Sequence, residues 1–317
     1  MVEIAKRTNQ GVMPKRPHVL MLFLDGVGIG RKDPTTNPFF FEKLYTLSNL
    51  LHDDIPHKKD SQRFYSDVSL VPLNATLGVR GLPQSGTGQT ALFTGKNAAR
   101  IINKHFGPYP YSSLRPIIER YNIFHRLSTI GRSVYFANAY PQKYFEHLKL
   151  NQSRQTVTSM SWKMAGFELN DSRSLDNGQG ISADITNEGW AKLGYPKITV
   201  ITPQQAGRNF VNLANEYDFV LFEYYLTDRA GHSQSMNEAV IVLKKFDDFL
   251  SGILKSFDDR SMLLLITSDH GNIEDLSTKS HTRNPVPLIA LGAYHQRFVK
   301  DLTSLIHVTP RILHLYQ

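Results

Sequence analysis

The stretch His18-Val-Leu-Met-Leu-Phe-Leu24, which runs directly into Asp25-Gly26, decides the fold. It is short, almost continuously apolar and stopped by a turn pair, a pattern typical of a buried β-strand. Strands of parallel sheets read this way because both of their faces are covered. Similar runs predict central strands at 200–201, Phe219-Val-Leu-Phe222 and Met262-Leu-Leu-Leu-Ile266, with companions at 133–137 and 286–291.

Amphipathic segments lie between these runs, at 117–127, 204–216 and 236–254. In the third segment, apolar residues recur every three or four positions, which predicts a helix with one buried face. Strands and helices that alternate in this order predict an α/β fold with a mostly parallel sheet and helices on both faces.

One segment, 142–197, breaks this alternation. It is richer in Ser, Asn, Asp and Gly, and it holds Trp162 and Trp190 without an obvious strand run. We interpret it as a small inserted cap or lid, called the cap segment below. The remaining ranges, 1–141 and 198–317, would form the core domain.

Composition excludes several classes of protein. Of 317 residues, 41% are hydrophobic and 20% charged, which excludes disordered and fibrous chains. The net charge of +8 suits an anionic substrate, but Lys and Arg are scattered, so no nucleic-acid partner is expected. Without cysteine, any metal must be held by His, Asp or Glu.

The start of the chain carries no membrane signal. The apolar run 18–24 is too short to span a bilayer, and 1–17 contains no apolar signal-peptide region, so we interpret it as a loose leader. We therefore expect no membrane association and a cytoplasmic location. The sequence leaves the oligomeric state open.

Asp25 begins the first of four chemically suggestive segments, each at the end of a predicted strand, where ligand sites of open α/β sheets lie. Asp25-Gly-Val-Gly-Ile-Gly30 resembles a dinucleotide-binding loop, but Gly30 comes one residue early and no helix follows at once. A metal ligand fits better; an Asp that merely starts a turn is the alternative.

Ser85 opens the second segment, Ser85-Gly-Thr-Gly-Gln-Thr-Ala-Leu-Phe-Thr-Gly95. The small residues predict a tight loop that leads into a helix, whose N-terminus favours anions. Ser85 is therefore a candidate nucleophile toward phosphorus, or else a plain helix cap. A P-loop is excluded, because Thr90 stands where its first Gly belongs and Asn97 replaces its Ser or Thr.

The last two segments combine carboxylates and imidazoles. In Tyr224-Tyr-Leu-Thr-Asp228-Arg-Ala-Gly-His232, the glycine and the preceding strand favour a loop that wraps both side chains around one ion, or an Asp–His pair that orients a loop. Thr267-Ser-Asp269-His270-Gly-Asn follows the most apolar strand, and His281 lies eleven residues after His270. Zn²⁺ or Mn²⁺ accepts such ligands.

Together the segments resemble the alkaline phosphatase superfamily, in particular its metalloenzyme branch with cofactor-independent phosphoglycerate mutase and phosphopentomutase. The order Asp, Ser, Asp-x-x-x-His, Asp-His, His is the order of that family. Ser85 and Gly95 have its ten-residue spacing, and His281-Thr-Arg-Asn-Pro-Val-Pro matches its His-Thr-x-Asn-Pro-Val-Pro.

The resemblance implies a site with two divalent metal ions, Zn²⁺ or Mn²⁺. One ion would be held by Asp228, His232 and His281, and the other by Asp25, Asp269, His270 and the Ser85 hydroxyl. Ser85 would attack a small phosphate ester and form a phosphoseryl intermediate, which water or an acceptor hydroxyl then resolves. The nearest donors in sequence for the phosphoryl oxygens are Thr87, Lys96 and Asn97.

Departures from the family pattern restrict the set of reactions that we expect. Mutases carry a larger cap with arginines, whereas the cap segment is short and offers few such cations. We therefore expect hydrolysis by a phosphomonoesterase or phosphodiesterase; a phosphomutase or a non-catalytic metal-binding protein are the alternatives. The sulfatase branch is excluded, since its nucleophile motif contains Pro and Arg that are missing after Ser85. Gln89 stands where relatives often have His.

Overall fold

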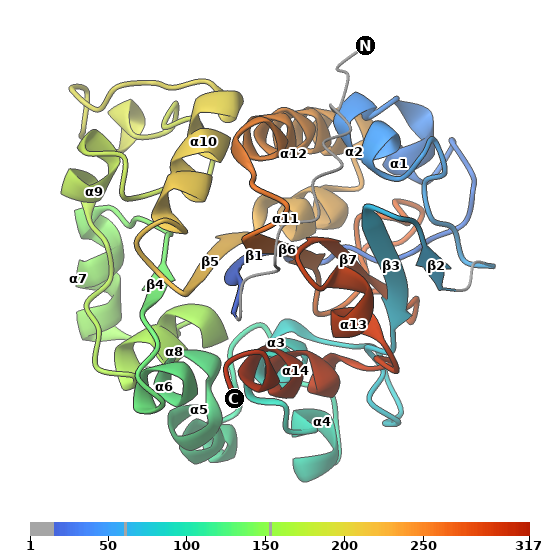
Figure 1. The fold of residues 1–317 in the computed structure, drawn as a ribbon, viewed down its shortest axis with the longest axis horizontal. Coiled ribbons are helices and arrows are strands. Elements are labelled where there is room, and N and C mark those ends of the chain that lie inside the picture. The colour runs from blue at the N-terminus through green and yellow to red at the C-terminus, as the bar shows by residue number, and fades with distance from the viewer. Residues whose placement is uncertain (1–15, 60–61, 152–153) are drawn as a thin grey trace.

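The fold is a seven-stranded mixed sheet between two layers of helices, with strand order β2-β3-β7-β6-β1-β5-β4 (Figure 1). The computed structural model describes residues 16–59, 62–151 and 154–317. The leader expected at 1–17 lies outside the described residues except for its last two positions. Within the described ranges, no helix is both long and apolar enough to cross a lipid bilayer.

Four parallel strands form one half of the sheet. β1 (His18–Leu24) lies between β5 (Phe219–Tyr224) and β6 (Met262–Thr267), and β4 (Val134–Phe136) closes the edge beside β5. Leu24 pairs with Tyr224, and Phe23 with Thr267, so the three central strands end nearly level. The residues that follow them therefore meet at one edge of the sheet.

The other half of the sheet is antiparallel. β7 (Val286–Gly292) pairs with β6, β3 (Val68–Leu73) with β7, and β2 (Arg63–Phe64) with β3. The mostly parallel sheet is thus confirmed at its centre, while the strand expected at 286–291 runs in the opposite direction. The strand predicted at 200–201 is wrong: Val200 is 58% exposed, and this stretch pairs with no strand.

Helices cover both faces, as predicted (Figure 1). Along β1, Leu20 and Leu22 face one apolar core, and Met21 and Phe23 face the other. The first core lies under α1 (Pro38–Phe41), α2 (Tyr45–Leu50), α10 (Pro203–Leu213) and α12 (Met236–Ser256). The second lies against α3 (Ser85–Thr94), α4 (Ala98–Ile101), η1 (Ser112–Leu114), α5 (Arg115–Tyr121), α6 (Ile123–Thr129), α13 (His295–Val299), η3 (Leu305–His307) and α14 (Val308–His314).

The single helix predicted at 117–127 is two helices, because Asn122 interrupts it. Its backbone is extended, with φ −63° and ψ 149°, and its side chain accepts a hydrogen bond from the N–H of His125 at 2.9 Å. Asn122 therefore ends α5 and caps α6, a role for which asparagine is favoured.

The cap segment is helical, with α7 (Gln142–Leu150), α8 (Val157–Met164), α9 (Ser172–Asp176) and η2 (Ala191–Leu193). Trp162 of α8 packs edge-on against Phe124 of α6, with ring centroids 5.0 Å apart. Single bridges join Asn138 to Ile181 and Ala139 to Asn170 just beyond β4. The division into a core and a cap at 142–197 stays a prediction.

The contact between α10 and α12 depends on Gly252, where a Cβ would lie 2.1 Å from the carbonyl oxygen of Gln204. Gly252→Ala should therefore lower the free energy of unfolding by about 1–3 kcal/mol, because the helices must move apart. Lys255→Ala, on the exposed face of α12, is the control and should change it by less than about 0.5 kcal/mol. Chemical denaturation measures both; equal stability of the two variants would contradict the prediction.

Candidate metal centre

Six acidic and imidazole side chains meet at the edge where the central strands end. They form two groups of three, in each of which the ligand atoms lie within 4.8 Å of one another. We call Asp228, His232 and His281 the histidine cluster, and Asp25, Asp269 and His270 the aspartate cluster. These are the two sets that the family resemblance implies.

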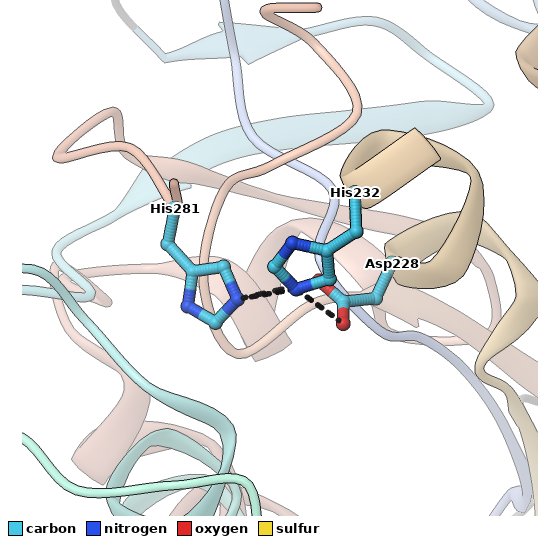
Figure 2. A group of neighbouring side chains, drawn as sticks. All are labelled: Asp228, His232 and His281. Atoms are coloured by element: carbon cyan, nitrogen blue, oxygen red, sulfur yellow. Dashed lines mark hydrogen bonds and ion pairs between the residues drawn. The ribbon is translucent and has the colours of Figure 1, made fainter. Parts of the chain in front are cut away.

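The histidine cluster is built on a helix, α11 (Leu226–Ser233), and the prediction of a loop at 228–232 is wrong. Asp228 and His232 lie one turn apart, so both reach the same point, as Figure 2 shows. Gly231 lies within this helix, and the side chain of Asn272 leaves no room for a side chain there, since a Cβ at 231 would lie 2.6 Å from Asn272 Cγ.

Carbonyl groups fix the orientation of both imidazoles in this cluster. His232 Nδ1 lies 2.9 Å from the oxygen of Lys279, and His281 Nδ1 lies 2.8 Å from that of Pro83. Since a carbonyl only accepts, each Nδ1 carries the hydrogen and each neutral ring presents a lone pair on Nε2. The two Nε2 atoms are 3.1 Å apart, and those of His232 and His281 lie 3.3 and 3.5 Å from the Asp228 carboxylate. This arrangement fits a divalent cation.

The aspartate cluster is buried, and Nε2 of His270 lies 3.3 Å from Asp25 Oδ1 and 3.5 Å from Asp269 Oδ2. Burial, and then the charge of Asp269, raise the pKa of Asp25 well above its ordinary value, and burial likewise raises the pKa of Asp269. Asp25 Oδ1 and Asp269 Oδ2 have no hydrogen-bond partner among the described residues. Burial opposes protonation of His270, but the nearby carboxylates outweigh it and raise its pKa to about 10. The donor set fits a second divalent cation.

The two clusters are in direct contact, because the rings of His270 and His281 stack with centroids 3.9 Å apart. Burial, together with the charge of His270, lowers the pKa of His281 to about 4. The hydrogen bond with Asp228 raises the pKa of His232. Burial would raise the pKa of Asp228, but this bond and the charge of His270 lower it instead.

Ser85 is the first residue of α3, and its Oγ lies 2.9 Å from Nε2 of His270. The cap position belongs to Gln84, so the alternative of Ser85 as a plain helix cap is wrong. Gly95 ends the same helix in the left-handed region, with φ 70°. The ten-residue spacing between Ser85 and Gly95 is therefore the length of one helix.

None of the three candidate phosphate donors presents its side-chain donor group beside Ser85. Lys96 and Asn97 follow the far end of α3, about 15 Å along the helix axis from Ser85. The Lys96 ammonium lies 4.3 Å from the ring centre of Tyr121, and Asn97 caps α4. Thr87 is near Ser85 but buried, and its hydroxyl donates to Gln84 O at 3.1 Å.

Two residues that contact candidate ligands, and one buried acid near them, were not assigned such roles from the sequence. Gln89, one turn after Ser85, donates to Asp25 at 3.3 Å, and Asn272 donates to Asp228 at 2.6 Å. Glu223 is buried near the end of β5, and burial raises its pKa to about 8. The sequence could have indicated Gln89 by its helical spacing from Ser85, and Asn272 by its place in Asp-His-Gly-Asn. It gave no signal for Glu223, which is a single acid in an apolar strand.

Comparison with known proteins adds a family and a fold. Residues 17–317 match the model of a family described as the metalloenzyme superfamily. The 2,3-bisphosphoglycerate-independent phosphoglycerate mutase of Antithamnion sp. is 27% identical over 150 residues, 42% of this chain and 29% of that protein. The protein of the same name from Acetivibrio thermocellus is 34% identical over 84 residues, 24% of this chain and 16% of that protein. The chain thus matches less than a third of either relative.

Two solved structures share the fold over nearly their whole length. The PH0037 protein from Pyrococcus horikoshii is 15% identical with a TM-score of 0.50, covering 95% of this chain and 96% of that one. The alkaline phosphatase from the Antarctic bacterium TAB5 is 14% identical with a TM-score of 0.50, covering 96% and 98%. At these identities the similarity concerns the fold alone.

Metal binding should release protons at neutral pH. His270, with its pKa raised to about 10, is protonated at pH 7.5 and must lose its proton to become a ligand, whereas His281, with its pKa lowered to about 4, has none to lose. The apparent affinity for Zn²⁺ should therefore fall as the pH falls. Calorimetric titration at pH 7.5 in two buffers with different protonation enthalpies measures the release; a heat that is independent of the buffer would contradict it.

Proposed function

The chain belongs to the metalloenzyme superfamily, and on this premise we propose that it is a two-metal phosphate-ester hydrolase with Ser85 as the nucleophile. The observation that carries the proposal is the position of Ser85 Oγ, buried at a helix N-terminus and 2.9 Å from a histidine of the aspartate cluster. The substrate would be a small phosphomonoester or phosphodiester.

In this proposal the two clusters bind metal ions and Ser85 attacks the substrate. The histidine cluster would hold one ion and the aspartate cluster the other, as Zn²⁺ or Mn²⁺. Bound there, the cations would stabilise negative charge on the attacking and leaving oxygens. The Ser85 hydroxyl would give its proton to solvent, and Oγ would bond to phosphorus while the ester P–O bond breaks. The departing alkoxide would take a proton from water, and a phosphoserine would remain. Water would then attack the phosphoserine, which releases phosphate and restores the Ser85 hydroxyl.

The cap segment supports hydrolysis rather than transfer to a second hydroxyl. It contains two arginines, Arg154 and Arg173, and both are exposed. The guanidinium of Arg173 pairs with Asp171 at 2.7 Å and its side chain is 88% exposed, so it is not directed into a buried phosphosugar site. Retaining a phosphosugar through two transfers needs such cations, whereas release of phosphate does not.

Ser85→Ala should lower the turnover of an aryl phosphate by at least about 10³-fold, because no other side chain takes the place of the nucleophile. Zn²⁺ binding should persist, since the six Asp and His ligands remain. Ser128→Ala, which removes a hydroxyl bonded to Phe124 O within α6, is the control and should keep full rate. Full activity of Ser85→Ala would refute the assigned nucleophile.

A phosphomutase is the second candidate, favoured by the names of the curated relatives. Phosphorus NMR of the metal-loaded protein with small phosphosugars separates the two. We expect free inorganic phosphate to accumulate; an isomerised phosphosugar with no free phosphate would establish the mutase instead. The third alternative, a non-catalytic metal-binding protein, is disfavoured because both clusters have three ligands each.

A further inference from the structure

Glu274 is a buried carboxylate beside the metal centre that none of the proposed chemistry uses. It is 1% exposed and accepts four hydrogen bonds. Oε2 accepts from the N–H groups of Gly28 at 2.9 Å and Asn272 at 2.7 Å. Oε1 accepts from the Thr282 hydroxyl at 2.5 Å and the Asn284 amide at 2.9 Å. No Lys, Arg or His in the described ranges forms an ion pair with it, so the donors that it accepts from are all neutral groups.

The donors to Glu274 come from segments that carry metal ligands. Gly28 lies three residues after Asp25, Asn272 two residues after His270, and Thr282 directly after His281. Asn272 extends the network, because its side-chain amide also donates to Asp228 Oδ1 at 2.6 Å and to Asp228 O at 3.1 Å. The carboxylate is thereby connected to the segments that carry all six ligands.

The backbone makes room for this carboxylate at two glycines. A Cβ at Gly28 would lie 2.3 Å from Glu274 Oε1, and one at Gly271 would lie 2.2 Å from the same atom. Both distances are far below any van der Waals contact, so a side chain at either position would displace the carboxylate. The glycines explain how three loops approach one acidic group closely enough for their N–H and O–H groups to reach it.

We propose that Glu274 is the positioning residue that holds the histidine and aspartate clusters in one fixed relation, so that both lose affinity for divalent cations when it is changed. Four hydrogen bonds to one carboxyl group tie together segments that are far apart in the sequence. Ligands that are ordered before binding cost less conformational entropy when the ion arrives. The inference shares with the proposed function only the premise that both clusters bind cations.

Glu274→Gln is the sharpest test because it keeps size and shape. Its NH₂ group must face either the two backbone N–H groups or the Thr282 and Asn284 donors, so part of the network is lost in either orientation. Calorimetric titration of metal-free protein with Zn²⁺ alone should show binding at both clusters weakened about 10- to 100-fold, the usual effect of removing a group that orients metal ligands.

Asp247→Asn is the matched control. Asp247 is also a buried carboxylate, but it accepts from the N–H groups of Thr46 at 2.9 Å and Leu47 at 2.8 Å, at the start of α2 and outside both clusters. This variant should bind Zn²⁺ as the wild type does. Wild-type affinity in Glu274→Gln, weakening at one cluster only, or equal weakening in Asp247→Asn would each overturn the proposal.

Should Glu274→Gln fail to fold, as judged by circular dichroism without metal, Thr282→Val provides the test. It removes one donor to Oε1 and should weaken Zn²⁺ binding in the same direction by a smaller factor, while Thr282→Ser restores it. Unchanged affinity in Thr282→Val would then overturn the proposal. Because the titration needs no substrate, the positioning role and the proposed hydrolysis fail separately: a wild type that binds Zn²⁺ but hydrolyses no phosphate ester refutes only the latter.

Discussion

The carboxylates of Asp25 and Asp269 lie buried together at the end of the central strands, with Nε2 of His270 3.3 and 3.5 Å from them, and the site is organised around them. Burial and mutual repulsion raise the pKa of Asp25, and one oxygen of each group has no hydrogen-bond donor in the described part of the chain. A cation removes both costs at once. Because β1 and β6 lie side by side and end level, the carboxylates that follow them lie within a few ångströms of each other. This proximity favours metal binding.

Much of the fold and of the site was predictable because the decisive signals are local. The central strands are apolar on both faces, and each is followed within a few residues by a chemically distinctive group. Asp25 follows β1 and Asp269 follows β6, so predicting the strands amounted to predicting where the ligands meet. The family match over 17–317 confirms the resemblance to the alkaline phosphatase superfamily drawn from those residues.

The predictions from sequence failed where tertiary contacts determine the local structure. Gly231 suggested a loop, but it accommodates the Asn272 side chain within a helix, a contact invisible in the sequence. Lys96 is close to Ser85 in sequence, yet an intervening helix carries it away. Strand β3, which lies between β2 and β7, was not predicted; it contains Pro72, and proline weakens a strand signal.

The position of β4 at the edge of the sheet has a consequence for the size of proteins with this architecture. The chain leaves the sheet after β4 and returns through α10 to β5, the strand that pairs with β4, so the residues between them add no strand to the sheet. Added length there grows outward into solvent at a small entropic cost. The length of this segment can therefore change while the sheet and the six candidate ligands stay unchanged.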